Sequence, residues 1–440
     1  MKRLMLTVAA ACACAAFAGR TCHWTGAEDS RWANPKNWLG EEVPGVLWDG
    51  VTGEPGYPTG DTAVFGASPF ATIDCTGLYS IGTVKITGAD APAYVFTNGS
   101  ALDPDGWGAL PIEPVSNSGT DIGIVIDASV TKDQTLGVVA LANLVNSGTG
   151  EAEAHPECLG DTFRISNDAD VAVIFSRFDC VRRRPGQNDK WQDLNLYFRG
   201  IGRYEFRETM KSHGGTYPSL GLASPGPFDV KCDLPKMRKI QLSGSHSKST
   251  LRIAEGCCVS FDTRINSPGI SIYGKNDLTI EGLGTLRFSE YREAVSWDRM
   301  SDFTLTDTAR LTIACPVTCL TYSPDYTTPS LHLVNGSGTF VCASSANTIP
   351  GSIDMGSKWD GVFSFPSVAN LGTITGFSFG SSKNGARVES TSAASETFSK
   401  NLIYTNSVRS VVANAGYGTL TVASAVSADE VGAGAVAEFA

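Results

Sequence analysis

The chain has 440 residues, of which 18% are charged, and its formal net charge at pH 7 is −11. This acidic balance argues against nucleic acid and anionic membrane surfaces as partners, because both attract basic proteins. The 47 glycines, together with the lack of long stretches rich in Glu, Lys, Leu and Ala, predict many short strands joined by tight turns.

Residues 1–18 have the organisation of a secretory signal peptide. Met1-Lys2-Arg3 is basic, residues 4–16 are apolar, and Ala16-Phe17-Ala18 has the small-x-small form of a cleavage site. The segment is too short to anchor the protein stably in a bilayer. Later in the sequence no apolar run reaches about 18 residues, so we expect no integral membrane segment after cleavage. The predicted location is secreted or at the cell surface, and at least periplasmic.

Four of the eight tryptophans, at positions 24, 32, 38 and 48, lie near the N-terminus. Three of them belong to a series of short motifs, which are Trp24-Thr25-Gly26, Trp32-Ala33-Asn34-Pro35-Lys36-Asn37-Trp38, Val43-Pro44-Gly45 and Gly60-Asp61-Thr62-Ala63-Val64-Phe65. The order of these motifs resembles the opening of secreted autotransporter-passenger-like β-solenoid proteins of Gram-negative bacteria. The resemblance implies export and a repetitive β fold, and it carries over no catalytic residue. This chain departs from the pattern by an insertion at residues 46–59.

Trp24, Trp32 and Trp38 allow two interpretations. They form either a platform on which sugar rings stack or a cap that shields the first turn of a solenoid. The cap is favoured, because the terminal repeat of a solenoid needs such protection. Asp61 is interpreted as a turn-forming residue rather than a catalytic acid.

A strand, a Gly-x-Gly turn and a second strand recur along the chain, at residues 196–206, 278–288 and 331–341. Similar segments without the paired glycines begin at 251 and 303, so the starts 251, 278, 303 and 331 recur at a nearly constant interval. This interval favours an all-β, right-handed parallel β-helix, or β-solenoid, with an N-terminal cap. An antiparallel β-sandwich remains the alternative, because Gly-rich turns also suit hairpins.

The predicted organisation has four parts. Residues 1–18 are the signal peptide, 19–110 the Trp-rich cap and first turns, 111–380 the solenoid with loop insertions, and 381–440 Ser/Ala/Gly-rich terminal turns and a cap. Strands are expected within 122–130, 163–166 and 171–175, and long loops at 98–114 and 181–189. Ser427-Ala428-Asp429-Glu430 is typical of the start of a short helix.

Twelve cysteines are present, two of them in the signal peptide. The even remainder of ten favours disulfides in an exported chain. Cys315 and Cys319 have a Cys-x3-Cys spacing, but a zinc site needs a second ligand pair, so we expect no metal. Cys257 and Cys258 are adjacent and, in a strand, point to opposite faces, which predicts that one of them is buried.

Candidate catalytic or binding residues outside the tryptophans lie around the basic run Arg182-Arg183-Arg184. A glycosidase needs two carboxylates at a fixed separation, and Asp179, Asp189 and Asp193 are the nearby acids. Arg183 and Asp189 are the candidate ligands for an acidic glycan, although a solvated charged loop is the favoured interpretation. The five histidines lack metal-site spacing, with His332 expected to face outward, and no nucleophile elbow or phosphate-binding loop occurs, so no cofactor is expected.

The predicted function is that of an exported, non-enzymatic β-solenoid acting as a structural or adhesive protein at the cell surface or outside the cell. One flank, lined by Ser, Thr and Asn, would contact a polysaccharide, a cell-surface glycan or a neighbouring copy of the protein. Two alternatives stay open. One is a polysaccharide lyase or glycoside hydrolase on a parallel β-helix, and the other is a carbohydrate-binding module.

Overall fold

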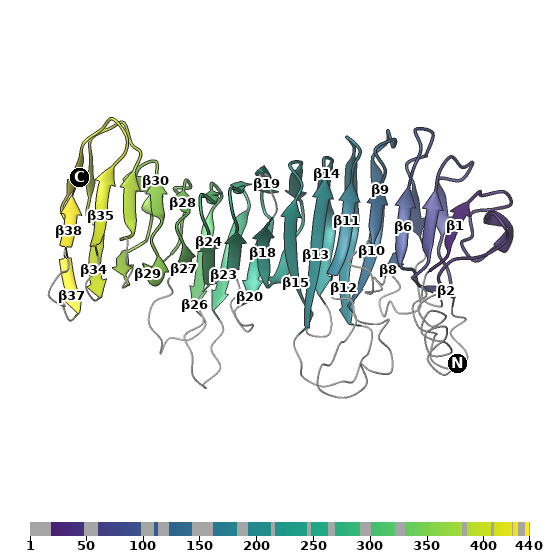
Figure 1. Ribbon diagram of the computed structural model, residues 1–440, viewed down its shortest axis with the longest axis horizontal. Helices are drawn as coiled ribbons and strands as arrows, with labels where there is room; N and C mark the ends of the chain where they lie inside the picture. Colours follow the sequence, from purple (N-terminus) through teal and green to yellow (C-terminus); the bar gives the residue numbers. More distant parts are fainter. Residues whose placement is uncertain are drawn as a thin grey trace, which may run out of the picture. The chain divides into compact units, whose positions relative to one another are not determined.

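The protein is built almost entirely of β-strands, which Figure 1 colours along the sequence. The computed structural model describes residues 19–47, 60–97, 110–112, 123–142, 162–182, 192–212, 216–243, 248–262, 269–290, 301–321, 331–349, 351–380, 385–405, 409–424, 426–429 and 436–439. The chain divides into two compact units, unit 1 at residues 1–218 and unit 2 at residues 219–440.

Unit 1 contains two main sheets whose strands alternate along the chain. Sheet 1 has the order β1 (Thr21–Trp24), β3 (Thr62–Phe65), β6 (Thr83–Ile86), β9 (Ile124–Ile126), β11 (Thr162–Asn167) and β13 (Gln192–Gly200). Sheet 2 has the order β4 (Thr72–Asp74), β7 (Val95–Thr97), β10 (Gln134–Ala142), β12 (Ala172–Arg182) and β14 (Arg203–Ser212), with β8 (Leu110–Ile112) also pairing with β10. A small antiparallel pair joins β2 (Val46–Leu47) to β5 (Leu78–Ser80).

Unit 2 repeats this alternation. Sheet 1 has β15 (Thr216–Ala223), β18 (Lys239–Leu242), β21 (Gly269–Ile272), β24 (Ser301–Leu305), β27 (Leu331–Gly336), β29 (Ser352–Trp359), β31 (Gly376–Phe379), β34 (Asn401–Thr405) and β37 (Val426–Asp429). Sheet 2 has β16 (Pro227–Val230), β19 (Lys248–Ile253), β22 (Asp277–Gly282), β25 (Arg310–Ile313), β28 (Thr339–Cys342), β30 (Val362–Phe365), β32 (Arg387–Ser390), β35 (Arg409–Asn414) and β38 (Val436–Phe439).

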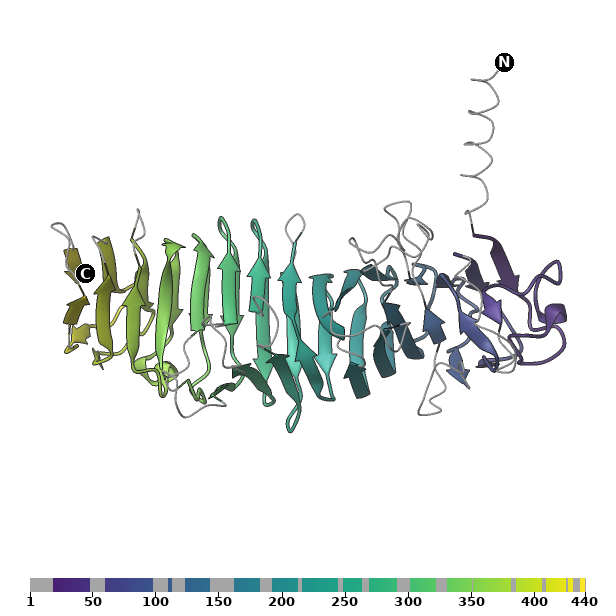
Figure 2. The same cartoon turned by 90° about the horizontal axis from the view of Figure 1, so that it is seen from below.

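A third sheet completes several turns of unit 2. It consists of β17 (Leu234–Met237), β20 (Cys258–Asp262), β23 (Thr285–Glu290) and β26 (Val317–Thr321), and a separate pair joins β33 (Glu396–Phe398) to β36 (Leu420–Val422). The chain therefore visits the sheets in rotation, and strands of successive turns lie side by side (Figure 2). The pairings within these sheets are parallel, as between the neighbours β19, β22 and β25. The fold is a parallel β-helix, and the antiparallel sandwich is wrong.

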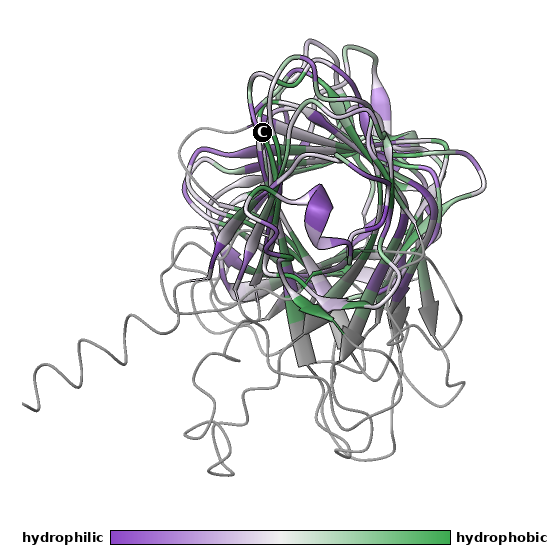
Figure 3. Cartoon of the chain, turned by 90° about the vertical axis from the view of Figure 1, so that its right-hand side faces the viewer, coloured by the Kyte–Doolittle hydropathy of each residue, from purple (hydrophilic) through white to green (hydrophobic). Residues whose placement is uncertain are grey.

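Apolar side chains stack in columns because the parallel strands are in register. Leu278, Leu311, Phe340, Phe363 and Val388 are paired along sheet 2 of unit 2, and each is almost fully buried. Buried residues alternate with more exposed residues along strands such as β22 and β25. Figure 3 shows that the strands contain both hydrophobic and hydrophilic residues. No single turn buries its inner face alone, so the stacked columns supply the core.

The predicted repeat starts do not belong to one sheet, and this part of the prediction is wrong. Residues 251 and 278 lie in β19 and β22 of sheet 2, whereas 303 and 331 lie in β24 and β27 of sheet 1. The residues in true register along sheet 2 are unevenly spaced in the sequence, and they are Lys248, Asp277, Arg310, Thr339, Val362 and Arg387. Strands of both sheets have the same alternation of buried and exposed side chains, so the local sequence pattern does not show to which sheet a strand belongs.

Several local predictions are confirmed and others are corrected. The expected strands correspond to β9, β11 and β12, and the Gly-x-Gly turns join β13 to β14, β22 to β23 and β27 to β28. The predicted loop at 98–114 contains β8, and the predicted loop at 181–189 overlaps β12, which continues to Arg182. The helix predicted at 427–430 is wrong, since β37 pairs there with β34. A neighbouring strand edge satisfies the backbone better than an isolated helical turn.

Candidate functional site

The three motif tryptophans lie together at the first turn of unit 1. Trp24, Trp32 and Trp38 surround Phe65, with ring centroids 5.8, 5.5 and 5.8 Å from its own. Their exposed fractions are 4, 0 and 2%. Trp38 also meets Trp24 and Trp32 edge-on at 5.1 and 5.0 Å, an arrangement that aromatic quadrupoles favour. We call residues 19–47 the N-terminal cap.

Each of these indoles also makes a specific hydrogen bond. Trp32 Nε1 donates to the carbonyl of Pro44 at 3.1 Å, and Trp38 Nε1 donates to the carbonyl of Trp32 at 2.7 Å. Trp24 Nε1 donates to Ser68 Oγ at 3.1 Å. Buried indole N–H groups need such partners. The hydrogen bond of Trp32 therefore joins the second motif to the third, while the ring contact between Trp24 and Trp38 joins the first motif to the second.

The part of the N-terminal cap that follows β1 lies along the first strand of each main sheet of unit 1, which is β1 in sheet 1 and β4 in sheet 2. Leu39 N donates to the His23 carbonyl of β1, and Thr25 N of the chain after β1 donates to the Asn37 carbonyl, at 2.9 and 2.8 Å. Residues 30 and 32 make the equivalent contacts to Asp74 of β4, at 2.8 and 2.7 Å. Unpaired strand edges invite association with other chains. The cap occupies these edges.

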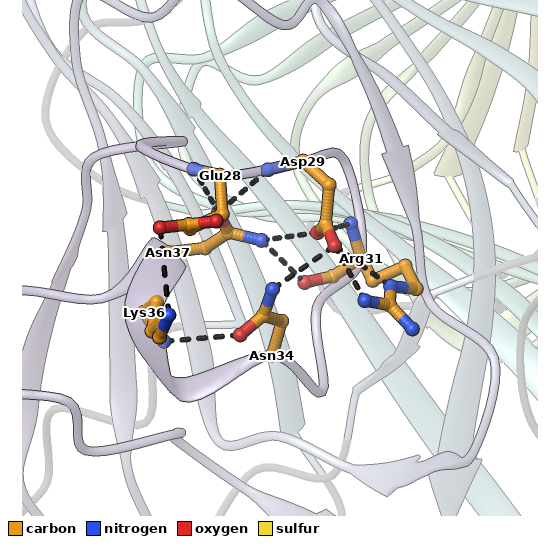
Figure 4. A network of polar contacts seen from close by, with 6 residues as sticks. All are labelled: Glu28, Asp29, Arg31, Asn34, Lys36 and Asn37. Atoms are coloured by element: carbon orange, nitrogen blue, oxygen red, sulfur yellow. Dashed lines mark hydrogen bonds and ion pairs between the residues drawn. The ribbon is translucent and has the colours of Figure 1, made fainter.

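A polar network around Asn37 holds the cap loop in shape (Figure 4). The side chain of Asn37 is fully buried, and its Oδ1 accepts from the backbone N–H groups of Glu28 and Asp29 at 2.9 and 3.0 Å. Its Nδ2 donates to Asp29 Oδ1 and to the carbonyl of Arg31, at 2.6 and 3.0 Å. Arg31, together with amide donors of Asn34 and Asn37, holds the pKa of the Asp29 carboxyl well below its usual range. The network ties the turn before Trp32 to the helical turn η1 (Pro35–Asn37).

Asp61 joins the cap to the second turn. It is 1% exposed and accepts hydrogen bonds from Arg20 N at 2.8 Å, Arg20 Nη2 at 2.7 Å and Gly45 N at 2.9 Å. Gly45 has φ +85°, and a Cβ there would lie 2.5 Å from the carbonyl oxygen of Ser80. Asp61 thus holds the third and fourth motifs together across the insertion. The sequence predicted only a turn-forming role for this residue.

The predicted ligand residues fall into two groups. Trp24, Trp32 and Trp38 are brought together, but a stacking platform needs exposed ring faces and these rings face one another in the core. Their geometry favours the cap. Arg183 and Asp189 lie outside the described residues. Asp179 is described, and it is buried on β12.

The expectation of disulfides is not met. No disulfide joins the nine cysteines that lie in the described residues, at positions 22, 75, 180, 232, 257, 258, 315, 319 and 342, while Cys158 lies outside them. Most of these thiols are apolar core residues of their strands. Of the adjacent pair, Cys258 is buried and Cys257 is half-buried, which confirms that one side chain points inward. Among the described ranges no group of three His, Cys, Asp or Glu residues is arranged to hold a metal ion.

Thiol labelling should follow this burial. Burial raises the pKa of Cys315 and of Cys342 to about 12, so neither supplies thiolate near neutral pH. We expect a maleimide at neutral pH to modify Cys257 first in the folded protein, as judged by peptide mass mapping. In urea the three should react at similar rates. Equally fast labelling of Cys342 in the folded protein would contradict this assignment.

Sheet 1 of unit 2 presents a polar outer face, which we call the polar flank. Inward residues such as Ile240, Ile270 and Phe303 are fully buried. The residues between them form two columns in register, which are Lys239, Gly269, Asp302, His332, Asp354 and Ser378, and Gln241, Ser271, Thr304, Asn335 and Lys358. The two members that β21 contributes, Gly269 and Ser271, are buried. His332 is 28% exposed, as expected for an outward position. The sequence did not reveal these columns, because their members are distant in the chain.

Comparison of the chain with family models, with curated proteins and with solved structures finds no match. Within the part of the chain that the structure describes, none of the helices has the length and apolar character needed to cross a membrane.

Proposed function

We propose that the protein is an exported, non-enzymatic β-solenoid that acts as a structural or adhesive element at the cell surface or outside the cell. The polar flank is the contact surface in this proposal. The observation that supports it best is the repetition of Gln241, Thr304 and Asn335 in one outward column of parallel strands. The signal-peptide pattern supports export, and buried, poorly ionised thiols are compatible with an oxidising compartment.

A repeated polar column suits a repetitive ligand. Neighbouring strands lie about 4.8 Å apart, so Thr304 and Asn335 offer hydrogen-bonding groups one strand step apart, whereas Ser271 of the same column is buried. Weak contacts repeated along one chain act together, because binding at one site raises the effective concentration at the next. A polysaccharide or a cell-surface glycan has this repetitive character, and a second copy of the protein is the other candidate for the same surface.

The test is retention of residues 19–440 on a panel of insoluble and immobilised polysaccharides. Replacing both Thr304 and Asn335 by alanine removes two flank groups, each worth about 1 kcal/mol in a hydrogen bond. We expect roughly a tenfold or greater loss of affinity for any polysaccharide that retains the parent protein. The matched control replaces Thr279 and Thr312, which face outward from sheet 2 of unit 2, and should bind normally.

Three outcomes would contradict this proposal. They are equal retention of both double variants, release of new sugar ends from any glycan, and failure to bind any glycan or to self-associate.

A further inference from the structure

Three side chains of the polar flank meet across neighbouring strands of unit 2. Asp302 of β24, His332 of β27 and Asp354 of β29 are consecutive register partners. His332 Nδ1 lies 3.3 Å from Asp302 Oδ1, and His332 Nε2 lies 3.3 Å from Asp354 Oδ2. Each side chain is mostly covered, with exposed fractions of 29% for Asp302, 28% for His332 and 31% for Asp354. The imidazole therefore faces one carboxylate with each nitrogen.

A glycine makes room for this ring. Gly356 follows Asp354 closely on β29, and a Cβ at that position would come within 2.9 Å of His332 Nε2. Such a contact is closer than real Cβ atoms adopt, so a larger residue would displace the ring or the strand. The strand that supplies the second carboxylate thus also leaves space for the imidazole.

No other charge faces the ring from the described strands around it. Asp302 is the only titratable residue of β24, and β29 carries only Asp354 and Lys358. Lys358 is exposed and registers with Asn335, further along β27. The next strands outward, β21 and β31, contain no titratable residue. The protonation state of His332 is therefore set by the two carboxylates and by burial.

We propose that Asp302, His332 and Asp354 form a proton-dependent clamp across three strands of the solenoid. An imidazolium has two N–H donors and can donate to both carboxylates. A neutral imidazole has one donor, and the lone pair of its other nitrogen then points at a carboxylate. Loss of one proton to solvent replaces one of the two attractive contacts with a repulsive one. The clamp connects strands of three successive turns, which are distant from one another in the sequence.

The direction of the pH effect follows from the folded state. The hydrogen bond to Asp302, and then the charges of Asp354 and Asp302, raise the pKa of His332, although burial opposes them. A histidine whose folded pKa is raised contributes stability that is fully present below its unfolded value of about 6.5. That stability is lost as the pH rises through the folded pKa. Burial also raises the pKa of Asp354, which limits the clamp on the acidic side.

An NMR titration of the histidine ring protons in residues 19–440 tests this proposal. We expect the His332 midpoint to lie above that of the same residue in the urea-unfolded chain. Asp302→Asn and Asp354→Asn should each lower the midpoint, by about 1 pH unit or more. The ring signal of His23, which lies on β1 in unit 1, is the internal control and should not respond to either substitution.

Hydrogen exchange provides a second readout. Corrected for intrinsic rates, protection of amides in β24, β27 and β29 should fall as the pH rises from mildly acidic to mildly basic in the parent protein, and should stay constant in His332→Gln. A folded midpoint no higher than the unfolded one, or identical protection profiles in the parent and His332→Gln, would overturn the clamp. Neither result depends on glycan binding, so this inference and the proposed function are tested separately.

Discussion

Replacing Trp32 by alanine is expected to destabilise the N-terminal cap by about 3–5 kcal/mol. Its indole is fully buried against Trp38 and Phe65, and its Nε1 donates to the carbonyl of Pro44. Truncation leaves a cavity and removes the contact that holds the third motif to the second. Urea unfolding followed by tryptophan fluorescence measures the loss, because three of the eight tryptophans lie in this cluster.

The matched control for this variant is Leu39→Ala. Leu39 lies in the same cap, directly after Trp38, but its side chain is 68% exposed. We expect a change within about 0.5 kcal/mol, as for most exposed positions. The comparison also separates the two interpretations of the tryptophans. A stable Trp32→Ala protein that had lost binding to a glycan would support the interpretation of the tryptophans as a sugar-stacking platform. Loss of the folded cap would support their structural role.

The second large effect is expected at the corner between β27 and β28. Gly336 has φ +123°, and a Cβ there would overlap the carbonyl oxygen of Leu305 on the preceding turn. A left-handed residue costs about 1–2 kcal/mol and overpacking about 1–3 kcal/mol. Gly336→Ala should therefore lower the free energy of unfolding by about 2–5 kcal/mol, measured by urea denaturation.

Substitutions at two other glycines of unit 2 measure the conformational cost and the steric cost separately. Gly256 has φ +78° with open space around it, so Gly256→Ala should show only the conformational cost. Gly284 has no positive φ, but a Cβ there would overlap the carbonyl oxygen of Ala254, so Gly284→Ala should show only the steric cost. If Gly336→Ala were no worse than Gly256→Ala, close approach between successive turns would not be what requires glycine at these corners.

Much of the fold could be predicted because its determinants are local. Alternation in segments such as 278–288 specifies a strand with one buried face, and Gly-x-Gly specifies a corner that another backbone approaches. The concentration of tryptophans near the N-terminus predicted a cap, and the burial of Trp24, Trp32 and Trp38 around Phe65 agrees with it. Disulfides were predicted from an even cysteine count in an exported chain, and a count carries no geometry. None of the nine cysteines in the described residues is paired.

The strands, the corners and the type of fold could be predicted from the amino-acid sequence, because side-chain alternation and glycine conformation act over a few residues. The register between strands of successive turns was determined only by the tertiary structure, since it depends on how the stacked columns of side chains pack together. Packing placed residues 251 and 303 on different sheets, connected Asp61 to Arg20 and Gly45, and aligned Asp302, His332 and Asp354. Connections of variable length between turns hide such neighbours, because only packing determines which residues face each other.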